Sequence, residues 1–158
     1  MEWDNACHKA FETLKEKLKN EPILTYPDFS KPFKIHTDAS DYGIGAILIQ
    51  EQNGQEKVIS YASRTLNKAE TSYATTEKEC LAIVWGITHF RPYIYGKPIT
   101  VVTDHNPLKW LMEFKDNSPR LLRWSLKIQE YDLRIEHRPG RNILMWIYYQ
   151  DHPLMTRL

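Results

Sequence analysis

The 158-residue sequence predicts an α/β domain in which a five-stranded mixed sheet has helices on both faces. Three observations predict this class. Three strand-like segments separated by short turns follow one another between residues 33 and 64. An apolar helical pattern over 75–90 then interrupts the strands. Two further strand patterns alternate with helical ones up to residue 137, and such crossovers require parallel neighbours in the same sheet.

The first element is an amphipathic helix over residues 3–19. Its apolar residues recur every three or four positions, and Lys and Glu occupy the opposite side. Pro22 and Pro27 then break the chain. We therefore expect residues 1–32 to be a lead-in to the domain proper, which we place at 33–142.

The first three strands are predicted as an antiparallel meander. Residues 33–40 alternate between apolar and polar side chains, and residues 43–50 are apolar and rich in β-branched side chains. Residues 57–64 form the third strand pattern. The turns fall at Asp41-Tyr42-Gly43 and at Asn53-Gly54, and the second of these pairs is a strong hairpin signal.

The second half of the domain alternates between helices and strands. The helix over 75–90 carries a wide apolar stripe, which is typical of a buried helix, and Arg91-Pro92 ends or kinks it. The later predicted elements are a strand over 99–104, a helical turn over 105–114 opened by Pro107, a helix from residue 119 and a strand over 131–137.

The composition excludes several classes of protein. Lys and Arg total 21 and Asp and Glu total 20, so a net charge of +1 gives no bulk attraction to nucleic acid. An aromatic content of 12% is too high for a disordered chain, and no apolar run reaches membrane-spanning length. Cys7 and Cys80 lie far apart outside any CxxC pattern, which favours incidental thiols over a disulfide or zinc framework. We expect a reducing, intracellular location, either cytoplasmic or nuclear.

Three acidic residues occupy positions suited to chemistry. Asp38 ends the first strand, Asp104 ends the fourth, and Glu79 lies in the first turn of the main helix. Functional groups collect at strand ends in open α/β sheets. Three carboxylates in one place need a cation, and oxygen ligands select Mg²⁺ or Mn²⁺. Such a site suits two-metal cleavage of a phosphodiester.

Each acid also has a purely structural interpretation. The run Thr76-Glu77-Lys78-Glu79 fits a capping box in which Glu79 accepts from the backbone of Thr76. Asp38 and Asp104 each precede turn-like segments and could serve only to initiate a turn. Spacing alone leaves both interpretations open.

Three long stretches of the chain resemble the ribonuclease H domain of gypsy-type LTR retrotransposon reverse transcriptases. They read FKIHTDASDYGIGAILIQ, then ISYASRTLNKAETSYATTEKECLAIVWGITHFRPYIYGKPITVVTDHNPLKWL, then SPRLLRWSLKIQEYDLRIEHRPGRN. The resemblance extends from about residue 3 to residue 142. Residues 1–32 resemble the end of the polymerase connection that precedes this domain. The resemblance therefore implies a fragment of a Pol polyprotein or the product of a gene derived from one.

The resemblance implies an RNase H-like fold and an endonuclease that cuts the RNA strand of RNA–DNA hybrids with four acids and two Mg²⁺ ions. By motif, Asp38 would bridge both metals, Glu79 would hold one of them near the ribose, and Asp104 would be the third ligand. The implied partners are an RNA–DNA hybrid and an upstream reverse-transcriptase polymerase domain, and no membrane is implied.

The tail over 143–158 departs from the family pattern. Ile147 stands where the family has its fourth acid, and Asp151 comes four positions later. A back-translation of residues 144–151 read in another frame forces Val-Asp, with its Asp at position 147. The next positions are Leu or Ile, a forced Leu, Ser or Pro, and Arg or Gly, so this frame can spell Leu-Leu-Ser-Arg there. We interpret the tail as a frameshifted end. Loss of the fourth acid predicts impaired hydrolysis, and the alternative is an inactive structural or nucleic-acid-binding module of retroelement origin.

Several basic and aromatic residues are candidates for contact with the hybrid, because hybrid recognition relies on phosphates, 2′-hydroxyls and shape. Ordinary solvated charges and core packing are the alternatives for each of them. The candidate nucleic-acid-binding residues are Arg64, Lys68, Tyr73, Lys109, Arg120 and Arg123.

Overall fold

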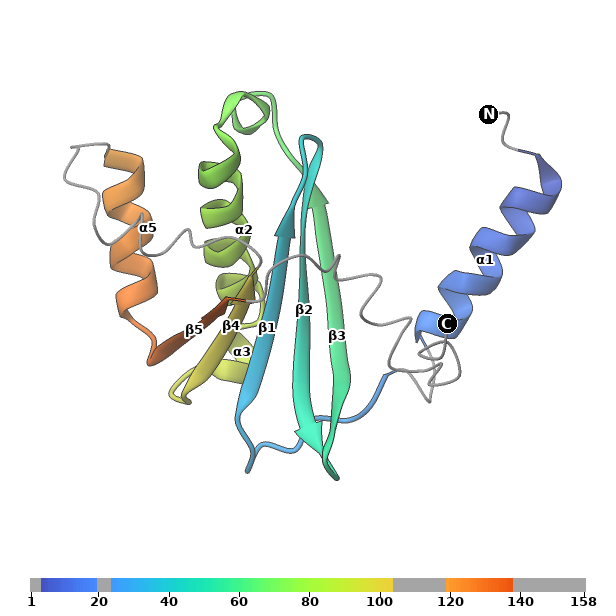
Figure 1. Ribbon diagram of the computed structural model, residues 1–158, viewed down its shortest axis with the longest axis horizontal. Helices are drawn as coiled ribbons and strands as arrows, with labels where there is room; N and C mark the ends of the chain where they lie inside the picture. The colour runs from blue at the N-terminus through green and yellow to red at the C-terminus, as the bar shows by residue number, and fades with distance from the viewer. Residues whose placement is uncertain (1–3, 20–23, 104–118, 138–158) are drawn as a thin grey trace.

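The computed structural model describes residues 4–19, 24–103 and 119–137 (Figure 1). One five-stranded sheet in the order β3-β2-β1-β4-β5 forms its centre. The strands are β1 (Phe33–Ala39), β2 (Gly43–Gln52), β3 (Gln55–Thr65), β4 (Ile99–Thr103) and β5 (Leu133–His137). The helices are α1 (Asn5–Lys19), the 3₁₀ turn η1 (Glu70–Ser72), α2 (Thr75–His89), α3 (Arg91–Ile94) and α5 (Pro119–Gln129).

The meander and the mixed character of the sheet are both confirmed. β2 pairs antiparallel with β1 and with β3. β4 pairs parallel with β1 on one side and with β5 on the other. Asn53 and Gly54 both have positive φ, at 55° and 75°, which a two-residue hairpin turn of this kind requires.

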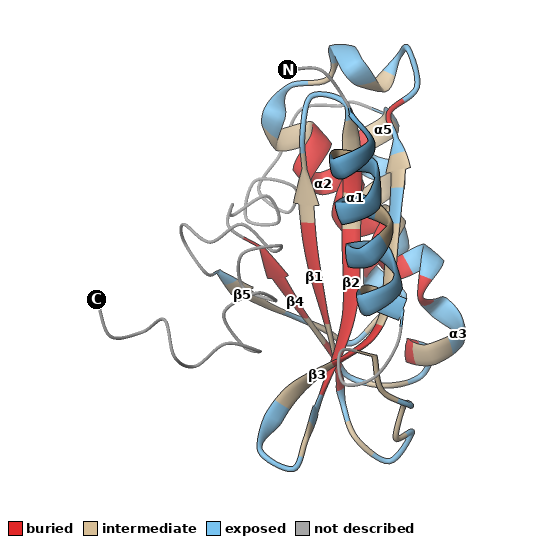
Figure 2. Ribbon diagram, turned by 90° about the vertical axis from the view of Figure 1, so that its right-hand side faces the viewer, coloured by how far each residue is buried: buried red, intermediate tan, exposed pale blue. Residues whose placement is uncertain are grey.

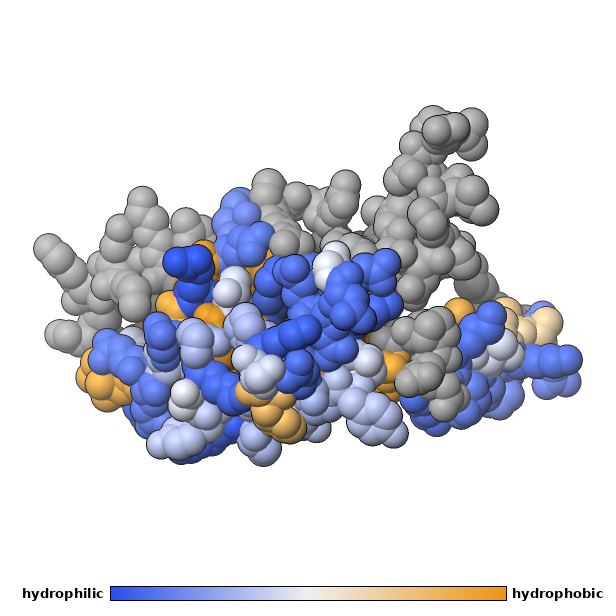
Figure 3. Space-filling model, turned by 90° about the horizontal axis from the view of Figure 1, so that it is seen from below, coloured by the Kyte–Doolittle hydropathy of each residue, from blue (hydrophilic) through white to orange (hydrophobic). Residues whose placement is uncertain are grey.

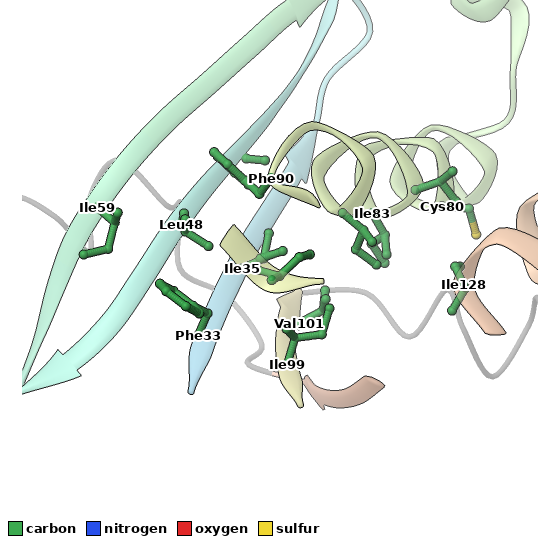
Figure 4. Close-up of a cluster of buried hydrophobic side chains, with 14 of the residues drawn as sticks. Phe33, Ile35, Leu48, Ile59, Cys80, Ile83, Phe90, Ile99, Val101 and Ile128 are labelled. Carbon is green, nitrogen blue, oxygen red and sulfur yellow. The ribbon is translucent and has the colours of Figure 1, made fainter. Parts of the chain in front are cut away.

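The main core lies between the sheet and α2, α3 and α5. Phe33, Ile35 and Leu48 project from the strands toward Ile83 of α2, and Ile128 of α5 closes the side of the cluster (Figure 4). In Figure 2 the buried residues concentrate on the central strands and on α2. Burial of these side chains is the main source of stability for the domain.

Gly86 allows α2 to lie close against the sheet. A Cβ atom at this position would come within 3.0 Å of the Cβ of Ala46 and 3.3 Å of Cγ2 of Thr37. The third nearest neighbour is Ile35 at 3.6 Å. The side chains of Ile35 and Thr37 therefore face α2, and those at alternate positions of β1 face the other side of the sheet.

The helices agree with the sequence patterns, with two additions, the 3₁₀ turn η1 and the short helix α3. α1 forms as expected, and none of its residues is buried. α2 ends at His89, and Pro92 lies in the first turn of the short helix α3, so the proline both ends one helix and begins the next. The helical turn expected over 105–114 lies outside the described residues.

The face of the sheet away from α2 carries a second, smaller apolar cluster. Ile47, Ile49 and Val58 are buried there, and Leu24 packs against them. A cavity of about 880 Å³ opens beside this cluster and is bordered by Leu18 of α1, together with residues of β1, β2 and β3.

No helix in the described part of the chain is long and apolar enough to cross a membrane.

Candidate functional site

Asp38 is a strand residue and not the start of a turn. It is the penultimate residue of β1 and pairs with Gly45 of β2. Ser40 makes the turn that follows, because its Oγ accepts hydrogen bonds from the backbone N–H groups of Tyr42 and Gly43 at 3.3 and 3.0 Å. The turn-initiating interpretation of Asp38 is therefore wrong.

The cap of α2 involves a different residue from the one the spacing suggested. The backbone N–H of Ala74 donates to Oε2 of Glu77 at 3.0 Å, and α2 begins at Thr75. The capping box predicted between Thr76 and Glu79 is wrong, because the helix begins earlier and Glu77 occupies the capping position. Glu79 therefore does not cap α2.

Glu79 belongs to the side of α2 that faces the sheet. It lies four residues before Ile83 and seven before Gly86, so the three positions fall on one side of a helix. Ile83 is in the main core, and Gly86 lies against β1 and β2. Glu79 itself is only 2% exposed. Burial of a carboxyl group in this position is costly unless a partner or a cation compensates for it.

The residue before Glu79 fixes the beginning of α2 to the end of β1. Nζ of Lys78 donates to Oδ1 of Asp41 at 2.8 Å, and Asp41 lies in the turn between β1 and β2. The hydrogen bond and the charge of Lys78 lower the pKa of Asp41. Because Figure 1 shows α2 starting at the end of the sheet where β1 ends, Glu79 and Asp38 belong to the same end of the sheet.

The two carboxyl groups reach this end from opposite faces of the sheet. Glu79 comes from the side of α2, whereas Asp38 alternates with Thr37 and borders the cavity on the other face. β4 ends at the buried Thr103, and Asp104, the next residue in the sequence, lies outside the described residues. In the described ranges no three His, Cys, Asp or Glu side chains form a metal-binding group.

The donor set at this end of the sheet fits a hard divalent cation. Asp38 is half-buried and Glu79 is buried, and both offer carboxylate oxygens, which are the ligands that Mg²⁺ and Mn²⁺ prefer. The neighbouring thiol of Cys80 belongs to the main hydrophobic core. Its burial, and secondarily the charges of Glu79 and Glu77, raise its pKa to about 12.

The opposite end of the sheet has a different character. Figure 3 views the molecule from that end, and its surface is mainly hydrophilic, with hydrophobic residues in separate spots. Lys97 lies there with its Nζ 5.1 Å from the ring centroid of Phe29. Among the residues that the structure describes, the one buried acidic side chain is Glu79, which belongs to the end of the sheet where β1 ends.

Two of the candidate phosphate-binding arginines are engaged within the protein. Arg64 makes a two-pronged ion pair with Glu70, at 2.7 and 2.9 Å, and lies 5.8 Å from the ring centroid of Trp85. Arg120 is paired with Glu77. The acidic partners were not anticipated from the sequence, because Arg120 and Glu77 are 43 residues apart and no periodic pattern links them.

The other candidate nucleic-acid contacts differ in exposure. Lys68 and Arg123 are exposed, as a phosphate partner must be. Tyr73 is half-buried and packs edge-on against Trp124, with ring centroids 6.1 Å apart. Lys109 lies outside the described residues. Ile147 and Asp151 in the tail also lie beyond the described part of the chain.

The Arg64–Glu70 pair predicts a specific sensitivity to acid. The hydrogen bond from Arg64 holds the pKa of Glu70 below its usual value of 4.5. A pKa that is lower in the folded state stabilises the fold above the unfolded value, and this stabilisation is lost as the pH falls through the folded value. We expect Glu70→Gln to lower the urea midpoint at neutral pH, by a margin that shrinks below pH 4.5.

The control for this prediction is Glu130→Gln, which removes the same charge at an exposed position. It should leave the urea midpoint nearly unchanged at every pH. A margin for Glu70→Gln that stays constant from neutral to acid pH would contradict the prediction.

Comparison with known proteins agrees with this architecture. The family model described as the RNase H-like domain found in reverse transcriptase matches residues 28–131. The chain is 48% identical over 141 residues to the Pol polyprotein of transposon 412 of Drosophila melanogaster. It is 38% identical over 143 residues to that of transposon gypsy. These matches cover 89% of this chain but only 11% and 13% of the relatives.

Solved structures show the same fold at low identity. The native protease–reverse transcriptase of prototype foamy virus superposes with a TM-score of 0.72 at 16% identity, covering 87% of this chain and 19% of that chain. An RNase H1 from Halobacterium salinarum gives a TM-score of 0.52 at 14% identity, covering 76% of this chain and 92% of that chain. The chain therefore belongs to the family of RNase H-like domains found in reverse transcriptases, and its relatives are retrovirus-related Pol polyproteins of transposons.

Proposed function

We propose that this domain hydrolyses the RNA strand of RNA–DNA hybrids with Mg²⁺ or Mn²⁺ at the end of β1. One observation carries the proposal. Glu79 continues the sheet-facing side of α2 up to the end of the sheet where Asp38 lies, and the Lys78–Asp41 ion pair holds the two elements together there. Carboxylates gathered at one end of a sheet are the kind of ligand that a divalent-cation nuclease uses.

The roles of the residues follow from the family resemblance. By motif, Asp38, Glu79 and Asp104 would hold the cations, and Asp38 would serve both of them. When bound, the ions supply a lowered pKa of the attacking water and charge stabilisation at the leaving oxygen. The chain itself keeps Glu79 away from bulk water, so that its carboxylate is oriented before the substrate arrives.

The partners follow from the relatives and from the surface. A foamy viral protease–reverse transcriptase has been solved in complex with an RNA/DNA hybrid, which supports a hybrid as the substrate here. Lys68 and Arg123, both exposed, are the described residues best suited to phosphate contact, with Lys109 as a further candidate. Because the relatives are far longer Pol polyproteins, we propose a reverse-transcriptase polymerase domain as the natural neighbour.

The tail sets the expected level of activity. Ile147 replaces the fourth family acid, so one ligand charge is lost and hydrolysis is expected to be weak. This substitution favours a second candidate function, in which the domain binds hybrids without cutting them. An intracellular location, cytoplasmic or nuclear, is part of the proposal.

The two candidates are separated by a substrate panel. The full chain is incubated with an RNA–DNA hybrid, duplex RNA or duplex DNA while Mn²⁺ or Mg²⁺ is titrated, and binding is followed in parallel by fluorescence anisotropy. We expect slow cleavage of the hybrid only, abolished by a chelator. Binding of the hybrid without cleavage at any metal concentration would establish the second function, and absence of both would exclude the two together.

A further inference from the structure

We propose that Arg120 is a positioning residue that acts through Glu77 to fix the first turn of α2, and with it the carboxylate of Glu79. The inference deepens the proposed function and rests on it for its catalytic meaning. Arg120 lies at the start of α5, and its guanidinium donates to Oε1 of Glu77. The two side chains are 34% and 18% exposed, so the pair is largely shielded from solvent.

Two aromatic rings hold the guanidinium in place. Its central carbon lies 4.0 Å from the ring centroid of Tyr73 and 5.8 Å from that of Trp124. A planar guanidinium stacks on such rings in a way that an ammonium group cannot. Nε of Arg120 is buried with no hydrogen-bond partner among the described residues, so that edge of the group is closed to a phosphate.

Glu77 transmits this constraint to the helix. One of its carboxylate oxygens accepts from Arg120, and the other accepts the backbone N–H of Ala74 as the cap of α2. The carboxylate therefore joins α5 to the N-terminal end of α2. Loss of Arg120 removes the charged partner that orients the capping carboxylate of Glu77. Because capping interactions stabilise the first turn of a helix, this loss should destabilise the first turn of α2.

The ion pairs of Glu77 and Lys78 explain why the position of Glu79 depends on Arg120. Lys78 is held by Asp41 at the β1–β2 turn, while Glu77 is held by Arg120 on α5. Consecutive helical residues point about 100° apart, so these two ion pairs restrain the turn from two directions. Glu79 follows immediately and points toward the sheet. Its carboxylate has a fixed position only while both restraints exist.

The experiment observes Glu79 directly in the full chain without metal. The carboxyl carbon resonance of Glu79 and the amide exchange of residues 77–80 are measured by NMR in the wild type and in Arg120→Met and Glu77→Gln. Lys127→Met is the matched control, since it removes a positive charge from an exposed position on the same helix. Glu77→Gln keeps the side-chain shape and remains informative if Arg120→Met folds poorly.

We expect the Glu79 resonance to move in both variants and the amides of residues 77–80 to exchange roughly tenfold faster, with no change in Lys127→Met. An unchanged Glu79 resonance and unchanged exchange in Arg120→Met and Glu77→Gln would overturn the inference, even if the melting temperature fell. Mn²⁺ affinity, measured by EPR on the same samples, should fall in both variants. Failure of the wild type to bind Mn²⁺ would instead count against the proposed function, because the NMR result does not depend on metal.

Discussion

Asp38→Asn is expected to slow hybrid cleavage by at least about a hundredfold. The asparagine keeps the shape of the side chain at the end of β1, where Asp38 pairs with Gly45, so the strand is retained. It removes the charge that would bridge two cations, and several kcal/mol of charge stabilisation correspond to a factor of this size. The measurement is the single-turnover rate on a labelled hybrid with Mn²⁺, at enzyme concentrations high enough to follow weak activity.

Asp132→Asn is the matched control for this result. It makes the same change of charge at an exposed position just before β5. Its rate should equal that of the wild type. Equal rates in Asp38→Asn and the wild type would place the observed cleavage elsewhere than at the end of β1. A wild-type rate matching that of a domain with all four acids would contradict the impairment expected from Ile147.

Gly86→Val is expected to destabilise the fold by about 3 kcal/mol. Even a Cβ atom at this position would come within 3.0 Å of the Cβ of Ala46 and 3.3 Å of Cγ2 of Thr37, and both of these residues belong to the central strands. α2 would have to move away from β1 and β2, and the contacts of Ile83 and Ile87 with the core would weaken. For a chain of this length the melting temperature should fall by roughly 6–12 °C.

Gly45→Val serves as the control for this prediction. A Cβ atom there would meet only the backbone oxygen of Ala62 at 3.9 Å, which is ordinary contact, and a β-branched residue suits a strand. Its melting temperature should change by much less than that of Gly86→Val, as measured by calorimetry. Equal losses in the two variants would show that the approach of α2 to the sheet does not limit stability.

The strands and turns were predictable because their signals are local. Alternation over 33–40 and the pair Asn53-Gly54 specify a strand and a hairpin turn through side-chain direction and positive φ. Pro92 marked the end of α2 for an equally local reason, since a proline lacks the N–H that a helix interior requires. The order of these elements along the chain then limited the sheet to a mixed arrangement, which the structure has.

The start of α2 shows where local signals failed. Thr76 with Glu79 and Ala74 with Glu77 have the same spacing, and threonine is the better capping residue of the two candidates. The helix nevertheless begins at Thr75, with Glu77 as its capping acid. Glu77 also pairs with Arg120, which is distant in the sequence but adjacent to Glu77 in space, and no local pattern contains this contact.

Sequence alone determined the fold class, the family resemblance and the identity of the acids, because periodicity, turn chemistry and motifs are written along the chain. Only the tertiary structure decided how the described residues among them are buried and paired. It buried the side chain of Glu79 on the side of α2 that faces the sheet. It also paired Arg64 with Glu70 and Arg120 with Glu77. The physical reason is that burial and ion pairing depend on distances between residues far apart in the sequence, and these distances exist only once α2 and α5 have packed against the sheet and each other.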